Sequence, residues 1–75
     1  KTYPNPLFDG HLTIELLEDQ TINATIIVRD VLGRICHQIS TPTLQNEVLI
    51  DQSGFYVVEL LNAGKLTYRS SIVKL

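Results

Sequence analysis

Apolar and polar side chains alternate along most of this chain. Leu12, Ile14 and Leu16 are separated by polar residues, and this period of two is typical of a strand with one face buried. The alternation recurs over residues 22–29, where β-branched side chains dominate, and again over residues 34–39. The first half of the chain therefore predicts three strands joined by turns.

The second half of the chain predicts three more strands, at residues 44–50, 55–61 and 66–75. The segment 55–61 is apolar on both faces, which indicates a central strand or a strand whose second face meets a partner. We expect Tyr56 to lie in the core. A further strand forms if the segment Tyr3–Phe8 also pairs.

Turn residues separate these segments. Asp30 and Gly33 are spaced as in a type I turn that closes on a glycine. Gly54 follows a polar stretch, and Gly64 lies in a short hairpin connection. We assign these glycines to backbone requirements, since glycine alone adopts left-handed conformations at little cost. No segment has a helical period.

The spacing of strands and turns predicts an all-β fold, an immunoglobulin-like β-sandwich of six to seven antiparallel strands. A chain of 75 residues forms one domain, with an extended, proline-containing entry segment at residues 1–8 and the sandwich at residues 11–75. A domain of this size buries only about 60% of its unfolded surface. It leaves little room for a catalytic cleft.

Charge and length exclude two classes of partner. The net charge is −2, and the six Lys and Arg residues are scattered singly, so there is no basic stripe for nucleic acid. No apolar run approaches the roughly 20 residues that span a bilayer. The sequence has no signal peptide and no initiator Met, so we expect a fragment or a processed piece, with any export signal lying upstream.

Reactive residues are few and poorly arranged. Cys36 is the only cysteine, so it cannot form an intrachain disulfide. We expect a small buried hydrophobe, and an intermolecular bridge or a reactive thiol is the alternative. His37 is its neighbour in a strand, where successive side chains point to opposite faces. His11 and His37 lack the spacing of a metal site. We therefore predict no catalytic, metal-binding or cofactor-binding residues.

Several short motifs occur in a characteristic order. They are Tyr3-Pro4-Asn5-Pro6, Phe8-Asp9-Gly10, Val28-Arg29-Asp30-Val31-Leu32-Gly33-Arg34, Gly54-Phe55-Tyr56-Val57-Val58 and Ile72-Val73-Lys74-Leu75. In this order and spacing they resemble the type A C-terminal sorting domain of the type IX (Por) secretion system of Bacteroidetes, over essentially the whole chain. Arg29 stands where the family often has an aromatic residue, and Ser70-Ser71 stands where a basic residue is common.

The resemblance implies a secretion signal and not an enzyme. Such domains direct their parent protein from the periplasm through the type IX translocon to the outer membrane, the cell surface or the medium. The implied partners are outer-membrane components of the translocon, a shuttle protein and a sortase that often removes the domain and anchors the cargo to lipopolysaccharide. The alternative is a retained structural or adhesive immunoglobulin-like module of a surface protein or of the secretion machinery.

The last strand is the main candidate for recognition. Its final residues, Ile72, Val73, Lys74 and Leu75, form an extended edge whose backbone groups could pair with a strand of a translocon subunit. Lys74 adds a charge. Phe55 is a candidate exposed docking residue. An ordinary closing strand is the alternative interpretation.

The entry motif has two interpretations. Each proline fixes its own φ and restricts the residue before it, so Tyr3, Pro4, Asn5 and Pro6 form a stiff, extended segment. The segment shields a sheet edge or acts as a rigid spacer between cargo and domain, and the two roles are compatible. Because segment 55–61 has apolar residues on both faces, a homodimer is a further possibility.

Overall fold

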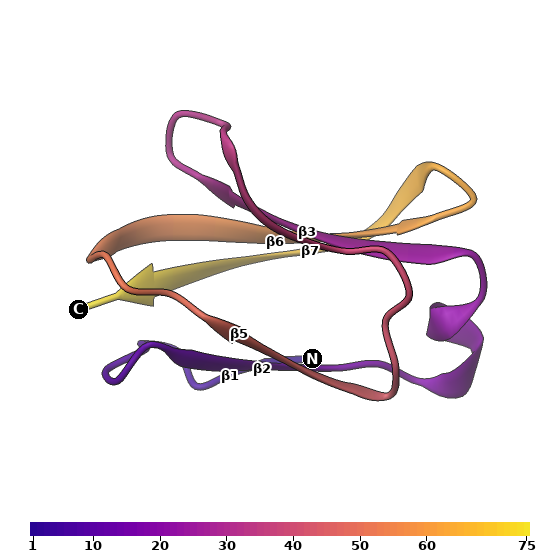
Figure 1. Ribbon diagram of the computed structural model, residues 1–75, viewed down its shortest axis with the longest axis horizontal. Helices are drawn as coiled ribbons and strands as arrows, with labels where there is room; N and C mark the ends of the chain where they lie inside the picture. Colours follow the sequence, from indigo (N-terminus) through magenta and orange to yellow (C-terminus); the bar gives the residue numbers. More distant parts are fainter.

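Two antiparallel sheets face each other in the computed structural model, which describes residues 1–75 (Figure 1). The strand order is β1-β2-β5 in one sheet and β4-β3-β6-β7 in the other. The seven strands are β1 (Thr2–Tyr3), β2 (His11–Glu15), β3 (Ala24–Asp30), β4 (Ile35–Ile39), β5 (Gln45–Leu49), β6 (Gly54–Asn62) and β7 (Lys65–Lys74). The predicted β-sandwich is confirmed.

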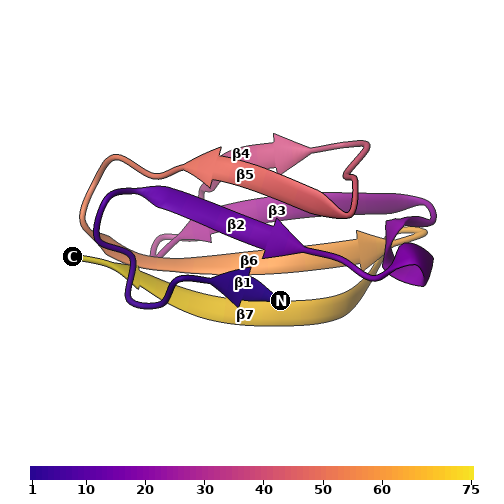
Figure 2. The ribbon, with the colours of Figure 1, turned by 90° about the horizontal axis from the view of Figure 1, so that it is seen from below.

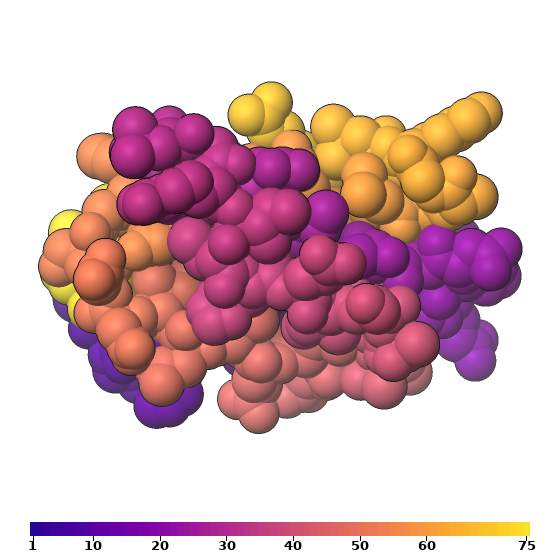
Figure 3. Space-filling model, turned by 45° about the horizontal axis from the view of Figure 1, so that its top comes forward, coloured from indigo at the N-terminus to yellow at the C-terminus, as the bar shows by residue number.

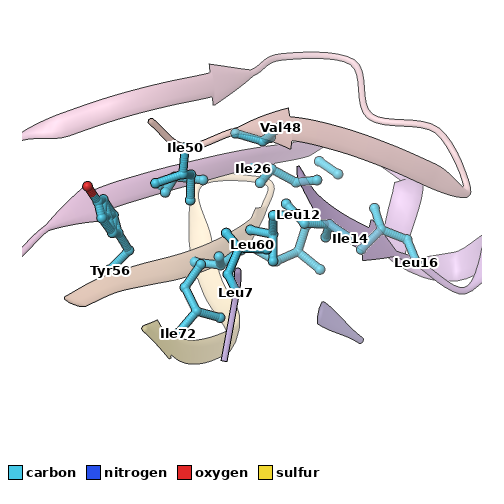
Figure 4. Packing of buried hydrophobic residues seen from close by; sticks show 13 residues of the cluster. Leu7, Leu12, Ile14, Leu16, Ile26, Val48, Ile50, Tyr56, Leu60 and Ile72 are labelled. Carbon is cyan, nitrogen blue, oxygen red and sulfur yellow. The ribbon is translucent and has the colours of Figure 1, made fainter. Parts of the chain in front are cut away.

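The alternating apolar residues fill the space between the sheets. β2 contributes Leu12 and Ile14, and the facing strand β6 contributes Val58 and Leu60, all at most 2% exposed. Figure 4 shows Leu12, Ile14 and Leu60 among the side chains that meet between the two layers. Thirteen residues form the cluster: Leu7, Leu12, Ile14, Leu16, Ala24, Ile26, Val28, Val48, Ile50, Tyr56, Val58, Leu60 and Ile72. Each large aliphatic side chain buried there contributes roughly 1.5–3 kcal/mol.

One polar residue, Asn46, is buried at the edge of this core. Its side-chain amide donates to the Ile14 carbonyl at 3.2 Å and to the Thr43 carbonyl at 2.8 Å, and its oxygen accepts from the Thr43 N–H at 2.9 Å. A buried amide costs free energy unless it is paired in this way. Asn46 therefore fixes the start of β5 against β2.

One expectation about local structure, a buried Cys36, is wrong, and two further local features were not predicted. Residues Glu18–Thr21 form a short 3-10 helix, η1, because the Gln20 side chain accepts from the Leu17 N–H at 2.7 Å and tightens the turn. Leu66 is 52% exposed, since a register shift between Leu60 and Leu61 moves it out of phase with the buried positions of β7. Cys36 is exposed, not buried, as explained below.

The entry segment is an integral part of the sandwich. Residues Thr2–Tyr3 pair with β2 as strand β1, and Figure 2 shows β1 lying over β7 along one side of the molecule. Leu7 is completely buried in the core. The boundary between an entry segment and a separate sandwich therefore does not exist in the folded chain.

Candidate interaction surface

The outer edge of β7 is covered by the beginning of the chain. The Leu7 N–H donates to the Val73 carbonyl at 2.8 Å, and the Leu75 N–H donates to the Leu7 carbonyl at 3.0 Å. These two bonds form a short parallel bridge that continues the sheet beyond β7. The burial of the Leu7 side chain holds this bridge in place.

Asn5 extends the cover with its side chain. Its amide nitrogen donates to the Ser71 carbonyl at 3.2 Å, and its oxygen accepts from the Val73 N–H at 3.2 Å. One side chain thus imitates the donor and acceptor of a neighbouring strand. The Thr2 and Ser70 hydroxyls form a further hydrogen bond at 3.0 Å.

This arrangement corrects the predicted free edge at residues 72–75. The groups that a partner strand would use on Ser71, Val73 and Leu75 are already bonded to Asn5 and Leu7. Of the two interpretations of Tyr3-Pro4-Asn5-Pro6, the structure shows the shielded edge.

Ile72 is likewise a core residue, 2% exposed. Alternation along β7 turns its side chain inward, so it is not available to a partner in the folded domain.

The other predicted recognition residues lie close together where β6 begins and β7 ends. Phe55 is the register partner of Val73, and their side chains share one face of the sheet. Phe55 is 66% exposed and Leu75 is 58% exposed. The Lys74 ammonium donates to the Leu75 carbonyl at 2.8 Å. We name Phe55, Val73, Lys74 and Leu75 the C-terminal corner.

Next to this corner, one carboxylate organises the turn between β3 and β4. Asp30 accepts from the N–H groups of Leu32 at 2.9 Å and Arg34 at 3.0 Å, and from the Arg34 guanidinium at 2.8 Å. Gly33 completes the turn at a φ of 83°, a left-handed conformation that favours glycine. Partial desolvation raises the pKa of Asp30, but the hydrogen bonds from Arg34 and Leu32 outweigh it and hold the pKa below its ordinary value.

Arg29 braces the turn against the sheet. Its Nε lies 2.9 Å from the Glu59 carboxylate on β6, and its Nη1 donates to the Gly33 carbonyl at 3.0 Å. The Arg29 side chain therefore connects the centre of the sheet to the turn. These contacts give Arg29 a structural role.

A groove of about 520 Å³ lies between this turn and the segment that opens β6. In Figure 3 the turn (magenta, upper left) stands above the surface, with the start of β6 (orange) beside it. Val31 and Leu32 project from the turn at 69% and 74% exposure, and Ile35 is 51% exposed. Phe55 closes the groove on the other side.

Cys36 also lines this groove. It is exposed because β4 is an edge strand, where the register with β3 shifts between Val28 and Arg29. An irregularity of this kind re-aims the neighbouring side chain. The sequence alternation alone did not reveal that β4 lacks a buried face.

The structure also places Tyr56 and the two remaining glycines predicted to form turns. Tyr56 is 8% exposed, which agrees with its predicted place in the core, and its hydroxyl donates to the Gln52 carbonyl at 2.6 Å. Burial raises the pKa of Tyr56, so the phenol remains a donor at neutral pH. Gly54 opens β6 at a φ of 147°, and Gly64 has a φ of 80° in the β6–β7 hairpin.

The surface offers contacts and little reactive chemistry. No group of three or more His, Cys, Asp or Glu side chains is placed to hold a metal ion. No helix in the structure is long and apolar enough to cross a membrane. Exposed apolar side chains such as Phe55 and Leu75 are suited to contact with another protein.

Comparison with known proteins identifies the class of this domain. Residues 1–74 match the family model described as the secretion system C-terminal sorting domain. The chain belongs to this family, and the predicted role as a sorting signal is confirmed. A sorting domain is not a catalytic family. No curated protein matches the sequence significantly.

The fold also occurs in a solved structure. A part of PorZ from Porphyromonas gingivalis superimposes with a TM-score of 0.80 and 21% sequence identity over 100% of this chain. PorZ is described as an essential bacterial surface component of the type-IX secretion system. The chain spans 11% of the length of PorZ. The likeness shows that the two share the sandwich fold.

Proposed function

We propose that this domain directs the protein that carries it through the type IX translocon, from the periplasm across the outer membrane to the cell surface. The observation that carries the proposal is the family match over residues 1–74, together with the fold shared with a part of PorZ. The proposed partners are outer-membrane components of the translocon, a shuttle protein and a sortase that releases the cargo for anchoring to lipopolysaccharide.

The proposed contact of the translocon is the C-terminal corner. Phe55 and Leu75 supply exposed apolar surface, and Lys74 supplies a positive charge beside them. Side chains and not backbone pairing carry this contact, because Asn5 and Leu7 already occupy the outer backbone groups of residues 71–75. Exposed aromatic and aliphatic anchors are the usual source of affinity at a protein interface.

Surface delivery of a reporter tests this proposal. A fluorescent protein with an export signal is joined ahead of residues 1–75 in a bacterium with a working type IX system, and the surface and periplasmic fractions are measured. The double substitution Phe55→Ser and Leu75→Ser should reduce surface delivery at least ten-fold. Truncation at residue 71 is a poor test, because it removes the core residue Ile72 and should strongly destabilise the domain.

The matched control is Leu17→Ser, which removes a side chain that is 70% exposed and lies outside the corner. It should deliver the reporter as the unmodified domain does. Unfolding curves of the variant chains check that each is folded. Normal delivery by the Phe55 and Leu75 variant would refute the role of the C-terminal corner, and normal delivery without the domain would refute the sorting function.

A further inference from the structure

A second groove, of about 490 Å³, crosses the end of β2 beside the first residue of the chain. Three of its lining residues, Lys1, Glu15 and Gln45, form a row across the three-stranded sheet. Lys1 and Glu15 exchange two backbone hydrogen bonds, at 2.8 and 2.7 Å, and Glu15 is the register partner of Gln45. Their neighbours Ile14 and Asn46 are buried, so alternation places this row on the outer face of the sheet.

Two leucines line the same groove with exposed side chains. Leu17 is 70% exposed and Leu44 is 52% exposed. Glu15, Gln20 and Gln45 supply polar groups beside them. Apolar side chains with a few polar groups at their margin are typical of a binding site.

Any polypeptide that is joined ahead of Lys1 enters the domain at this groove, because Lys1 itself lines it. In the longer chain the Lys1 nitrogen is a peptide N–H, which can donate the same bond to the Glu15 carbonyl. In Figure 2 the line of β1, followed back past the N-terminus, runs toward η1 (the purple coil at the right). The preceding residues therefore leave β1 close to Gln20 of η1, which also lines the groove.

Gln20 prevents these residues from continuing the ladder along β2. Its side-chain oxygen accepts from the Leu17 N–H at 2.7 Å, and its own N–H donates to the Leu17 carbonyl at 2.9 Å. The Leu16 N–H is bonded to the Leu44 carbonyl at 2.8 Å. Because the backbone donors that follow Glu15 are occupied, contact between side chains is left to hold the preceding chain.

We propose that this groove binds the residues directly ahead of Lys1, the linker that joins an exported protein to the domain. The linker turns across the end of β2 and places an apolar side chain, two residues ahead of Lys1, between Leu17 and Leu44. Alternation selects that residue, because it shares the face of Lys1. This inference rests on the proposed function, which requires a protein ahead of the domain.

Covalent attachment favours the linker over a separate protein or a second copy of this chain. A segment held by a short connection has an effective concentration on the order of 1 mM. A contact with a dissociation constant of about 1 mM is then about half occupied by the linker, whereas a separate partner at about 1 μM leaves it almost empty. A groove that is too weak to capture a free peptide is therefore sufficient to order the linker.

A disulfide trap in a purified fusion tests where the linker lies. A fluorescent protein precedes residues 1–75, Cys36→Ser removes the native thiol, and one cysteine stands two residues ahead of Lys1. Paired with Leu44→Cys, this cysteine should form a disulfide in mild oxidant. The matched control is Leu49→Cys, at the other end of β5 and 49% exposed, which should cross-link about ten-fold more slowly because its Cα lies out of reach.

The trap separates a bound linker from one that continues straight along β1. The Cα atoms of a disulfide lie at most about 7 Å apart. A straight linker stays two strand spacings from Leu44, about 9–10 Å, so only a linker that turns across β2 brings the two cysteines together. Equal rates at positions 44 and 49 would overturn the proposal.

Cleavage of the linker tests the apolar contact. A site for a sequence-specific peptidase, with a leucine two residues ahead of Lys1, is compared with the same site separated from Lys1 by a flexible Gly/Ser spacer. The adjacent site should be cut about ten-fold more slowly, because a bound segment must detach before it is cut. Leu44→Ser should remove most of this difference, and the control Leu49→Ser should leave it unchanged.

Two results would show that the domain only obstructs the peptidase. Equally slow cleavage of the adjacent site in Leu44→Ser, Leu49→Ser and the unmodified fusion would overturn the contact, and so would equal cleavage of the adjacent and distant sites. Unfolding curves check that both variants are folded. If Leu44→Ser is not folded, the disulfide trap decides.

The linker contact and the sorting function fail in different ways, because both measurements use purified protein and do not depend on delivery. If the trap and the cleavage pattern appear but the domain delivers no reporter, the sorting function is refuted although the contact exists. If delivery is normal and neither the trap nor the slow cleavage appears, only the linker contact is refuted.

Discussion

The two outer strands of the four-stranded sheet, β4 and β7, each have a backbone edge that could pair with another chain, and the two edges are protected in different ways. The edge of β7 is closed by Asn5 and Leu7, which bond to its outer backbone groups. The edge of β4 has no such cover, and none of its five side chains is fully buried. β4 is short and has an irregular register with β3, features that discourage pairing with other chains. The β7 edge is protected because other residues bond to it, and the β4 edge is protected because its strand is short and irregular.

The comparison predicts that stability depends on the β7 edge far more than on the β4 edge. Leu7→Ala should cost about 2–5 kcal/mol, because it leaves a cavity in the core. This is a large part of the total, which is roughly 4–11 kcal/mol for a chain of this length. Urea unfolding followed by circular dichroism measures the loss. A cost below 1 kcal/mol would show that the entry segment does not belong to the folding unit.

The matched change on the open edge is Ile35→Ala. Ile35 is 51% exposed and lies outside the core cluster, so its truncation should cost about 0.5 kcal/mol or less. The same urea experiment compares the two edges directly. Equal costs for Leu7→Ala and Ile35→Ala would remove the distinction between them.

The amide of Asn5 should give the next effect in size. Asn5→Ala removes two hydrogen bonds to β7. Because the freed groups can bond to water, we expect a net cost of about 1 kcal/mol. For a domain of this size that lowers the melting temperature by about 4–8 °C. Gln38→Ala on β4, where the side chain makes no hydrogen bond, is the control and should leave the melting temperature unchanged.

Acid should loosen the turn that joins β3 to the open strand β4. The pKa of Asp30 is lower in the folded chain than in the unfolded one, because Arg34 and Leu32 donate to its carboxylate. Its contribution to stability is therefore complete above about pH 4 and is lost as the pH falls through the folded value. Thermal unfolding between pH 5 and pH 2 measures this loss. Asp30→Asn should flatten the pH dependence, and an unchanged slope would contradict the assignment.

The smallest effect should come from Cys36 on the open edge. Its thiol is exposed, so a maleimide should label it in the folded chain nearly as fast as in urea. Cys36→Ser should change the unfolding free energy by less than about 0.5 kcal/mol. Slow labelling of the folded chain would show that the β4 edge is covered in solution.

The sequence predicted the layered fold because alternation is a local signal. Leu12 and Ile14 in β2, and Val58 and Leu60 in β6, lie in the core where their period of two places them. The signal fails where the register changes. The shift near Leu61 reverses the phase at the start of β7 and exposes Leu66, and nothing in the local pattern indicates it.

The parts of the site that depend on distant contacts could not be predicted. The pairing of Leu7 with Val73 joins residues at opposite ends of the chain. The sequence around either residue does not indicate that they pair. The burial of Ile72 and the exposure of Cys36 follow from the positions of their strands in the sheet. Phe55 was expected on the surface, but its place between the turn and the corner required the three-dimensional arrangement.

The cover over β7 has a mechanical consequence. A polypeptide that is joined ahead of Lys1 and pulled during transport loads β1 first, and this segment is held to β2 through Lys1, Thr2 and Tyr3. The force then reaches Leu7 and, through its two hydrogen bonds, the end of β7. Tension on the cargo would therefore detach residues 1–7 from the edge of β7 before it unfolds the rest of the sandwich.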